Sequence, residues 1–204
     1  MNIIRYPQKS EWDAIVERPH LDVSKLNATV SHVLSEVKAH GDEAVKRFEE
    51  QFDHARLEQL AVTEQEIDEA MTLVSDDLKA AIRLAHHNIH AFHLAQQFES
   101  KKIETAAGVV CWQKSMAIQK VGLYIPGGTA PLFSTVLMLA TPAKIAGCEE
   151  IVLCTPPDRE GRVNPAILAA ARIAGVSKIF KVGGVQAIGA MAYELAVGNL
   201  DLDG

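Results

Sequence analysis

The chain has 204 residues, of which 48% are hydrophobic and 23% are charged, and its formal net charge at pH 7 is −6. This composition predicts a globular protein with a substantial core and excludes a largely disordered one. With 20 basic and 26 acidic residues and only 5% aromatic residues, the chain has neither the basic surplus nor the stacking surfaces that nucleic-acid binding requires.

Neither a membrane span nor a secretory leader is expected. Residues 1–12 (MNIIRYPQKSEW) lack the apolar core of a signal peptide. The most apolar run, residues 132–140, is much shorter than the roughly 20 residues that a spanning helix needs. The three cysteines are Cys111, Cys148 and Cys154. They form no paired pattern, so we expect buried free thiols and a cytoplasmic location.

The N-terminal half shows helical periodicity and no strand pattern, which predicts four or five helices. Apolar residues recur at helical spacing over 26–37, and Gly41 is expected to end that helix. Thr63 and Glu66 form a capping-box pattern, and boundary residues predict a long helix over about 75–95.

The pattern changes near residue 105. Residues 108–119 alternate weakly, which predicts a short β-ribbon that turns around Lys114 and Ser115. Strands are then expected at 121–125, 149–156 and 177–184, each followed by a helix. Continuous aliphatic strands separated by helices predict a parallel sheet that is covered on both faces. We therefore expect an α/β protein with a mainly helical segment, 1–107, followed by a parallel-sheet domain, 108–204.

Glycine and proline mark the ends of the helices in the second half. Pro142 is expected to kink or restart the helix after the first strand, because its ring does not fit an unbroken helix interior. Gly147 should end that helix. Asn164 and Pro165 are a typical N-cap and first-turn pair for the next helix, which Gly175 should close.

The carboxyl ends of the three strands should meet at one edge of the sheet, where open α/β folds bind ligands. Gly127 and Gly128 follow the first strand there, where free backbone N–H groups and a helix N-terminus favour an anion. The sequence IPGG matches neither the Rossmann fingerprint nor the P-loop, so it fits a tight turn as well as a nucleotide contact. Gly183 and Gly184 repeat the arrangement after the third strand.

Tyr124 and Gln186 are the polar side chains best placed at this edge. The tyrosine can stack on a ligand or hydrogen-bond to it, and the glutamine can both donate and accept. Both can instead be structural residues that satisfy nearby backbone groups, and the pattern by itself favours that interpretation.

The remaining candidates for chemistry are weaker. His86, His90 and His93 recur on one helix face beside His87, but without an HExxH motif or nearby acidic residues they indicate a half-polar face rather than a metal site. No GxSxG elbow is present. The pair Glu49-Glu50 is expected to be solvated and not to act as an acid/base pair.

Two long segments closely resemble one enzyme family. Residues 121–157 (VGLYIPGGTAPLFSTVLMLATPAKIAGCEEIVLCTPP) and 182–193 (VGGVQAIGAMAY) are similar to histidinol dehydrogenases, and 40–53 (HGDEAVKRFEEQFD) and 88–93 (NIHAFH) fit the same family. The resemblance implies incomplete Rossmann-like domains, a bound zinc, a homodimer, and oxidation of L-histidinol to L-histidine through histidinal with two NAD. These enzymes catalyse the last step of histidine biosynthesis.

The resemblance also assigns site residues. It implies that Tyr124 and Gln186 contact NAD, which reverses the structural interpretation above, and that Pro126, Gly127 and Gly128 contribute to the same surface.

The chain corresponds to less than half of a family member, and after Tyr193 it ceases to follow the pattern. The family's zinc ligands, acid/base pair and most substrate contacts belong to the other half, so no catalytic or metal-binding residue is assigned here. We expect the 204-residue chain to be inactive by itself. The alternatives are a non-enzymatic truncated remnant and a stand-alone dinucleotide-binding module.

Overall fold

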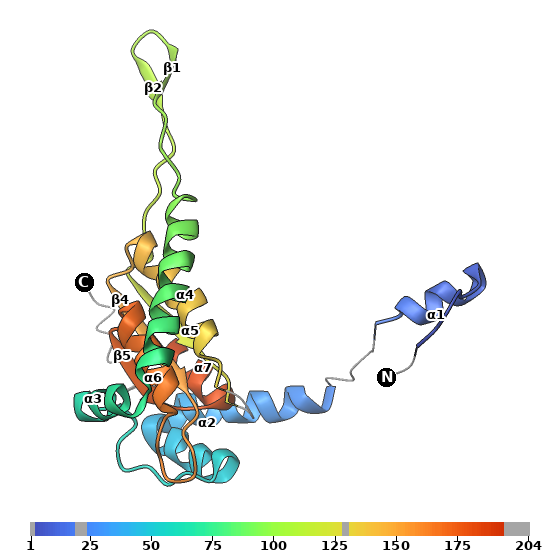
Figure 1. The fold of residues 1–204 in the computed structure, drawn as a ribbon, viewed down its shortest axis with the longest axis vertical. Coiled ribbons are helices and arrows are strands. Elements are labelled where there is room, and N and C mark those ends of the chain that lie inside the picture. Colours follow the sequence, from blue (N-terminus) through green and yellow to red (C-terminus); the bar gives the residue numbers. More distant parts are fainter. Residues whose placement is uncertain (1–2, 19–23, 128–130, 194–204) are drawn as a thin grey trace.

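A computed structural model describes residues 3–18, 24–127 and 131–193 (Figure 1). Its helices are η1 (Lys9–Glu11), α1 (Trp12–Val16), α2 (Ser24–Phe48), the π-helical turn η2 (Glu49–Asp53), α3 (Glu64–Leu73), α4 (Asp76–Leu94), α5 (Phe133–Ala146), α6 (Pro165–Ala174) and α7 (Gly184–Ala192). Its strands are β1 (Ile103–Ala106), β2 (Val109–Cys111), β3 (Lys120–Tyr124), β4 (Glu150–Thr155) and β5 (Lys178–Lys181). No helix in these ranges is long and apolar enough to cross a membrane.

The centre of the fold is a three-stranded parallel sheet in the order β3-β4-β5, which confirms the predicted strands and their direction. The middle strand β4 is buried from Ile151 to Thr155. Successive side chains of a strand point to opposite faces. Val152 and Cys154 accordingly enter one core and Leu153 enters the other.

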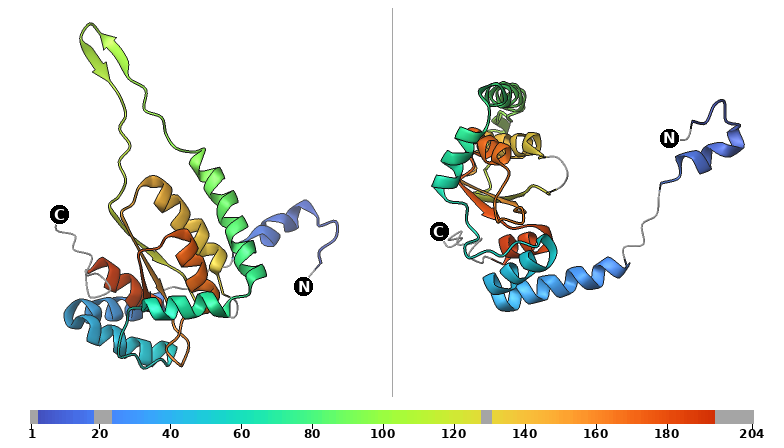
Figure 2. Two further views of the ribbon diagram at one scale, coloured as in Figure 1. Left: turned by 60° about the vertical axis from the view of Figure 1, so that its left-hand side comes forward. Right: turned by 60° about the horizontal axis from the view of Figure 1, so that its bottom comes forward.

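Helices cover both faces of the sheet, as the sequence pattern predicts (Figure 2). On one face, α2 and α7 build a core that includes Val33 and Val37. On the other face, α5 and α6 pack with α3 and α4, which supply Ile67 and Ile82. Both cores thus combine side chains from before and after residue 107. The division of the chain into two domains, 1–107 and 108–204, therefore stays a prediction.

The predicted helix boundaries are confirmed where a cap is local. The Thr63 hydroxyl accepts the Glu66 N–H at 3.2 Å, the Ser75 hydroxyl accepts the Leu78 N–H at 3.3 Å, and Asn164 Oδ1 accepts the Ala166 N–H at 2.9 Å. The C-caps Gly147 and Gly175 are left-handed. Gly41, with φ 57° and ψ −136°, breaks the helical geometry inside α2, so the expected break occurs there.

Of the two outcomes expected at Pro142, a kink or a restart, the restart is wrong, because α5 continues as one helix to Ala146. A proline removes one backbone hydrogen bond from a helix. In α5 the preceding turns are anchored in the core by Val136, Leu137 and Ala140, which are almost completely buried. This packing holds the helix together across the proline.

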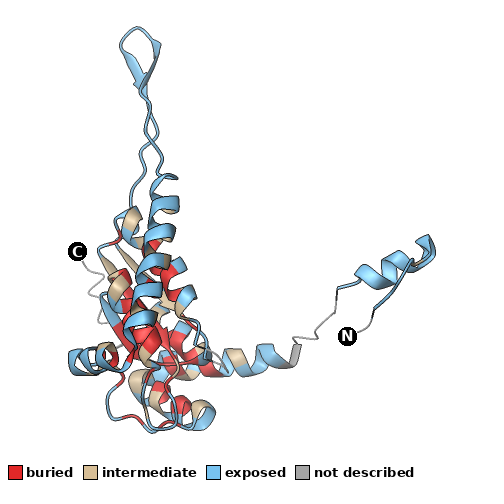
Figure 3. Ribbon diagram, in the orientation of Figure 1, coloured by how far each residue is buried: buried red, intermediate tan, exposed pale blue. Residues whose placement is uncertain are grey.

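The β-ribbon also differs from the prediction, because it turns at Gly108 and not around Lys114 and Ser115. Gly108 has φ 78°, a conformation that glycine adopts without strain, and its N–H donates to Glu104 Oε1 at 2.9 Å. The ribbon projects from the body and all its residues are exposed (Figure 3). Cys111 lies in it, so the prediction of a buried thiol is wrong at this position.

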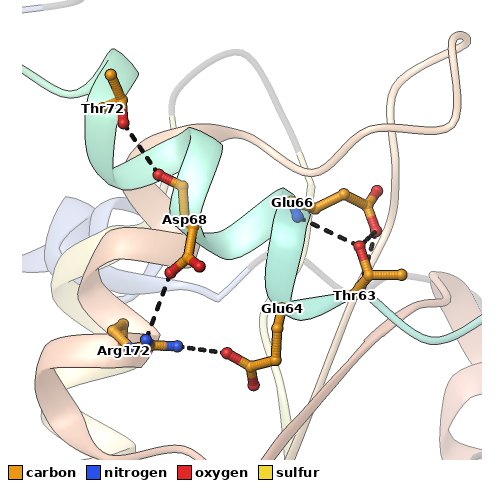
Figure 4. Close-up of polar contacts among 6 residues, drawn as sticks. All are labelled: Thr63, Glu64, Glu66, Asp68, Thr72 and Arg172. Carbon is orange, nitrogen blue, oxygen red and sulfur yellow. Dashed lines mark hydrogen bonds and ion pairs between the residues drawn. The ribbon is translucent and has the colours of Figure 1, made fainter.

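A set of polar contacts joins α3 to α6 (Figure 4). Arg172 Nη1 lies 2.6 Å from Glu64 Oε2, and its Nη2 lies 3.4 Å from Asp68 Oδ1. Because these side chains are largely exposed, the ion pairs contribute little stability. The buried Ile67 and Ala70 beside them carry most of the α3 packing.

Candidate functional site

A cavity of about 970 Å³ lies at the carboxyl edge of the parallel sheet. The turns after β3, β4 and β5 all contribute to its wall, as the strand order predicts, and parts of α2 and η2 complete it. Tyr124, Pro126, Gly127 and Gln186 line it. The structure therefore brings together four of the five residues expected to bind the cofactor. The fifth, Gly128, lies outside the described residues.

Tyr124 ends β3 and its ring is partly buried. Its hydroxyl oxygen accepts the backbone N–H of Gly184 at 2.9 Å, which ties β3 to the first turn of α7. Burial raises the pKa of Tyr124, so the phenol stays protonated at neutral pH. The hydroxyl proton is not used by this bond and can be donated to a ligand.

Gln186 lies in the first turn of α7 and is only 1% exposed. Its Nε2 donates to Glu49 Oε1 at 2.8 Å. Its Oε1 has no hydrogen-bond partner within the described part of the chain. Gln186 thus bonds to a distant carboxyl side chain and not to nearby backbone groups, and it lines the cavity with one buried carbonyl oxygen that has no partner in the described ranges.

The glycines of the two strand-end turns are required by close packing. A Cβ at Gly127 would lie 2.6 Å from Pro156 Cγ, and one at Gly183 would lie 2.7 Å from Pro156 Cβ. The ring of Pro156, after the central strand, therefore lies against the backbone of both neighbouring turns. Gly184 has φ 53°, which a residue with a side chain rarely adopts. Packing against Pro156 therefore accounts for the glycines at positions 127 and 183.

Glu49 is completely buried, so the expectation of a solvated Glu49-Glu50 pair is wrong for this residue. It opens the π-helical turn η2, and its Oε1 accepts the Gly183 N–H at 2.9 Å as well as the Gln186 amide. Burial raises the pKa of Glu49 to about 7, against the effect of these two bonds, and the nearby Asp53 carboxylate adds to the rise. Burial also raises the pKa of Asp53, which lies in the cavity wall.

Thr155 and Arg162 are further cavity residues that the sequence did not single out. Thr155 ends β4, and its buried hydroxyl oxygen has no partner among the residues that the structure describes. Arg162 lies in the following loop and brings a positive charge to the wall. The available signal was their position, Thr155 at the end of a predicted strand and Arg162 in the loop after it, since ligands bind at such strand ends.

The histidines of α4 do not converge with other ligand groups. Over residues 3–18, 24–127 and 131–193, no group of three or more histidine, cysteine, aspartate or glutamate side chains could hold a metal ion. The rings of His86 and His90 are 6.1 Å apart between centroids, and partial burial lowers the pKa of His86. Nothing in this arrangement corresponds to a metal centre.

Cys154 is buried in β4, and burial raises its pKa to about 12. A thiol with such a pKa is not a nucleophile at neutral pH. Cys148 is buried as well. Both are the buried free thiols that the sequence predicts.

The fold and the cavity define an open α/β protein whose ligand site lies at the carboxyl edge of a parallel sheet. A sequence profile described as histidinol dehydrogenase matches residues 16–198. The chain belongs to the histidinol dehydrogenase family.

Individual relatives agree with this assignment. A histidinol dehydrogenase of Bacteroides fragilis is 63% identical over 193 residues, which are 95% of this chain and 45% of that protein. One of Yersinia pestis is 45% identical over 194 residues, 94% of this chain and 43% of its own length. The crystal structure of histidinol dehydrogenase from Elizabethkingia anophelis matches with a TM-score of 0.88 and 46% identity, over 94% of this chain and 44% of that one. The chain thus spans less than half the length of these relatives.

Proposed function

We propose that this chain forms the NAD-binding part of a histidinol dehydrogenase, with the cavity at the sheet edge as the cofactor site. The observation that carries the proposal is the shared wall in which Tyr124, Gln186, Pro126 and Gly127 come together. Gly128, next to Gly127 in sequence, belongs to the same proposed surface.

The polar groups of the wall suit a dinucleotide. The Tyr124 hydroxyl can donate a hydrogen bond, and Gln186 Oε1 is a buried acceptor without a partner in the described ranges. Thr155 Oγ1 can do either, and Arg162 can interact with a phosphate. A cavity of about 970 Å³ is large enough for a ligand of this size. When bound, NAD would supply the hydride acceptor for an oxidation.

The reaction proposed for the longer protein is the oxidation of L-histidinol to L-histidine through histidinal, with two NAD, in histidine biosynthesis. Family resemblance also suggests a zinc-containing homodimer in the cytoplasm. The described residues do not offer a ligand set for zinc, so we assign this chain neither metal ligands nor an acid/base residue. Its proposed contribution is to bind and orient the dinucleotide.

A titration of the chain with NAD, with the heat of binding measured by calorimetry, tests the cofactor site. Wild type should bind saturably, and Tyr124→Ala should weaken binding about tenfold or more, because a ring contact and a hydrogen bond are lost together. Tyr6→Ala is the matched control, since Tyr6 is 97% exposed and far from the cavity in sequence. If wild type does not bind NAD saturably, the cofactor site is refuted. Equal affinities of wild type and Tyr124→Ala would place the ligand elsewhere.

A turnover assay separates the binding role from catalysis. The 204-residue chain, supplied with zinc, histidinol and NAD, should produce no NADH above the background without protein. Saturable NAD binding without turnover is the expected combination for a cofactor-binding part. Robust NADH production would contradict this assignment of roles.

A further inference from the structure

Glu49 reaches the cavity wall from a distant part of the sequence. It lies 137 positions before Gln186, and its Oε1 accepts hydrogen bonds from two groups at the start of α7. These are the Gly183 N–H at 2.9 Å and Gln186 Nε2 at 2.8 Å. The glutamate is fully buried. Burying a carboxyl group is unfavourable unless its polar atoms are paired. Here Oε1 is paired with the wall of the candidate site, and Oε2 has no partner among the described residues.

These bonds decide which end of the Gln186 amide is available. A primary amide has a donor end and an acceptor end. Glu49 Oε1 acts as an acceptor toward both the Gly183 N–H and Gln186 Nε2, so it engages the donor end of the amide and turns the carbonyl oxygen away from itself. That oxygen lies over the backbone of Gly184, where an added Cβ would be only 2.6 Å from it. That oxygen is buried and has no hydrogen-bond partner among the described residues, although its side chain belongs to the cavity lining.

We propose that Glu49 is a positioning residue that orients the Gln186 amide so that its carbonyl oxygen accepts a hydrogen bond from the dinucleotide. The inference rests on the proposed function, because it takes Gln186 as a contact of NAD. Glu49 itself touches no ligand and acts only through Gln186 and the α7 turn. The site would therefore select a ligand group that donates an N–H or O–H at this point.

A double-mutant cycle on NAD affinity tests the proposal in the 204-residue chain. The four proteins are wild type, Glu49→Leu, Gln186→Met and the double variant, with Kd measured by calorimetry and folding checked by circular dichroism. Each single change should raise Kd about tenfold, the usual effect of one lost hydrogen bond in a buried site. The double variant should bind no more weakly than Gln186→Met, since Glu49 acts through that side chain.

Conservative variants distinguish orientation from general damage to the fold. Glu49→Gln keeps a carbonyl oxygen for both donors and should bind within about threefold of wild type. Glu50→Leu, at the exposed neighbouring position, should leave Kd unchanged. If Glu49→Leu does not fold, Glu49→Asp replaces it in the cycle, because its shorter side chain cannot reach both donors equally.

The outcomes separate this inference from the proposed function. The inference is overturned if Glu49→Leu binds NAD as tightly as wild type. It is also overturned if the two increases in Kd multiply, so that the double variant binds about a hundredfold more weakly than wild type. Loss of affinity in Glu49→Gln equal to that in Glu49→Leu would also overturn it. Saturable binding that Gln186→Met does not change refutes the inference and leaves NAD binding in place. Absence of NAD binding by wild type refutes the proposed function itself.

Discussion

Replacing Glu49 by glutamine should change how stability depends on pH. Burial raises the pKa of Glu49 from 4.5 to about 7 in the folded chain. Between these pH values the folded state keeps a proton that the unfolded state has released, so the free energy of unfolding falls as pH rises. This difference between the folded and unfolded pKa of Glu49 lowers the free energy of unfolding by about 3 kcal/mol, at about 1.4 kcal/mol per pKa unit. Above pH 7 both states are ionised and the effect levels off.

Glutamine has the shape of the protonated side chain and does not titrate. Its carbonyl oxygen can accept the Gly183 and Gln186 donors that Glu49 Oε1 accepts now. We therefore expect Glu49→Gln to have a stability close to that of wild type near pH 5 and to exceed it by about 3 kcal/mol at pH 8. Urea denaturation at pH 5, 6, 7 and 8 measures this difference.

The control is Glu50→Gln, which alters an exposed glutamate in the same turn. Its stability should follow that of wild type at every pH, because the Glu50 side chain is exposed and its replacement removes no buried carboxyl group. A difference between Glu49→Gln and wild type that stays constant within about 1 kcal/mol from pH 5 to 8 would refute the reasoning about burial.

Two substitutions and one chemical modification test the packing, the capping and the thiol exposure. Gly183→Ala should lower the free energy of unfolding by about 1–3 kcal/mol in urea denaturation, because its Cβ would lie 2.7 Å from Pro156 Cβ; unchanged stability would contradict the close packing. Asn164→Ala removes the cap bond to α6 and should cost about 1 kcal/mol in the same assay; a loss below about 0.3 kcal/mol would mean that water replaces the cap. Alkylation followed by mass spectrometry should modify Cys111 in the folded protein and Cys154 only after unfolding; rapid modification of Cys154 would disprove its burial.

Local signals made much of the fold predictable. The cap at Asn164 and the glycine at 175 act over a few residues, so the boundaries of α6 can be read from neighbouring letters. The same holds for the buried strand β4, whose continuous apolar run indicates a central parallel strand. The sequence prediction placed the turn of the β-ribbon wrongly, because the alternation of apolar and polar residues is weak there. The ribbon bends at Gly108, which has a positive φ.

The sheet edge as a site also follows from the sequence, since strand ends in a parallel sheet must meet. Tyr124 and Gln186 could be placed there by position, and the resemblance of their segments to histidinol dehydrogenases gave them a role. Their hydrogen bonds could not be foreseen, because the partner of Tyr124 is a backbone group 60 positions away.

Sequence alone predicted the order of strands and helices along the chain and the helix caps, because these depend on neighbouring residues. It also predicted the sheet edge as a candidate site, because the carboxyl ends of parallel strands meet there. Tertiary structure alone decided that Glu49 is buried while Glu50 is exposed. The two glutamates have nearly the same local sequence. They differ because the π-helical turn directs Glu49 toward the first turn of α7, more than 130 positions away. There burial raises its pKa, and two N–H groups donate hydrogen bonds to its Oε1.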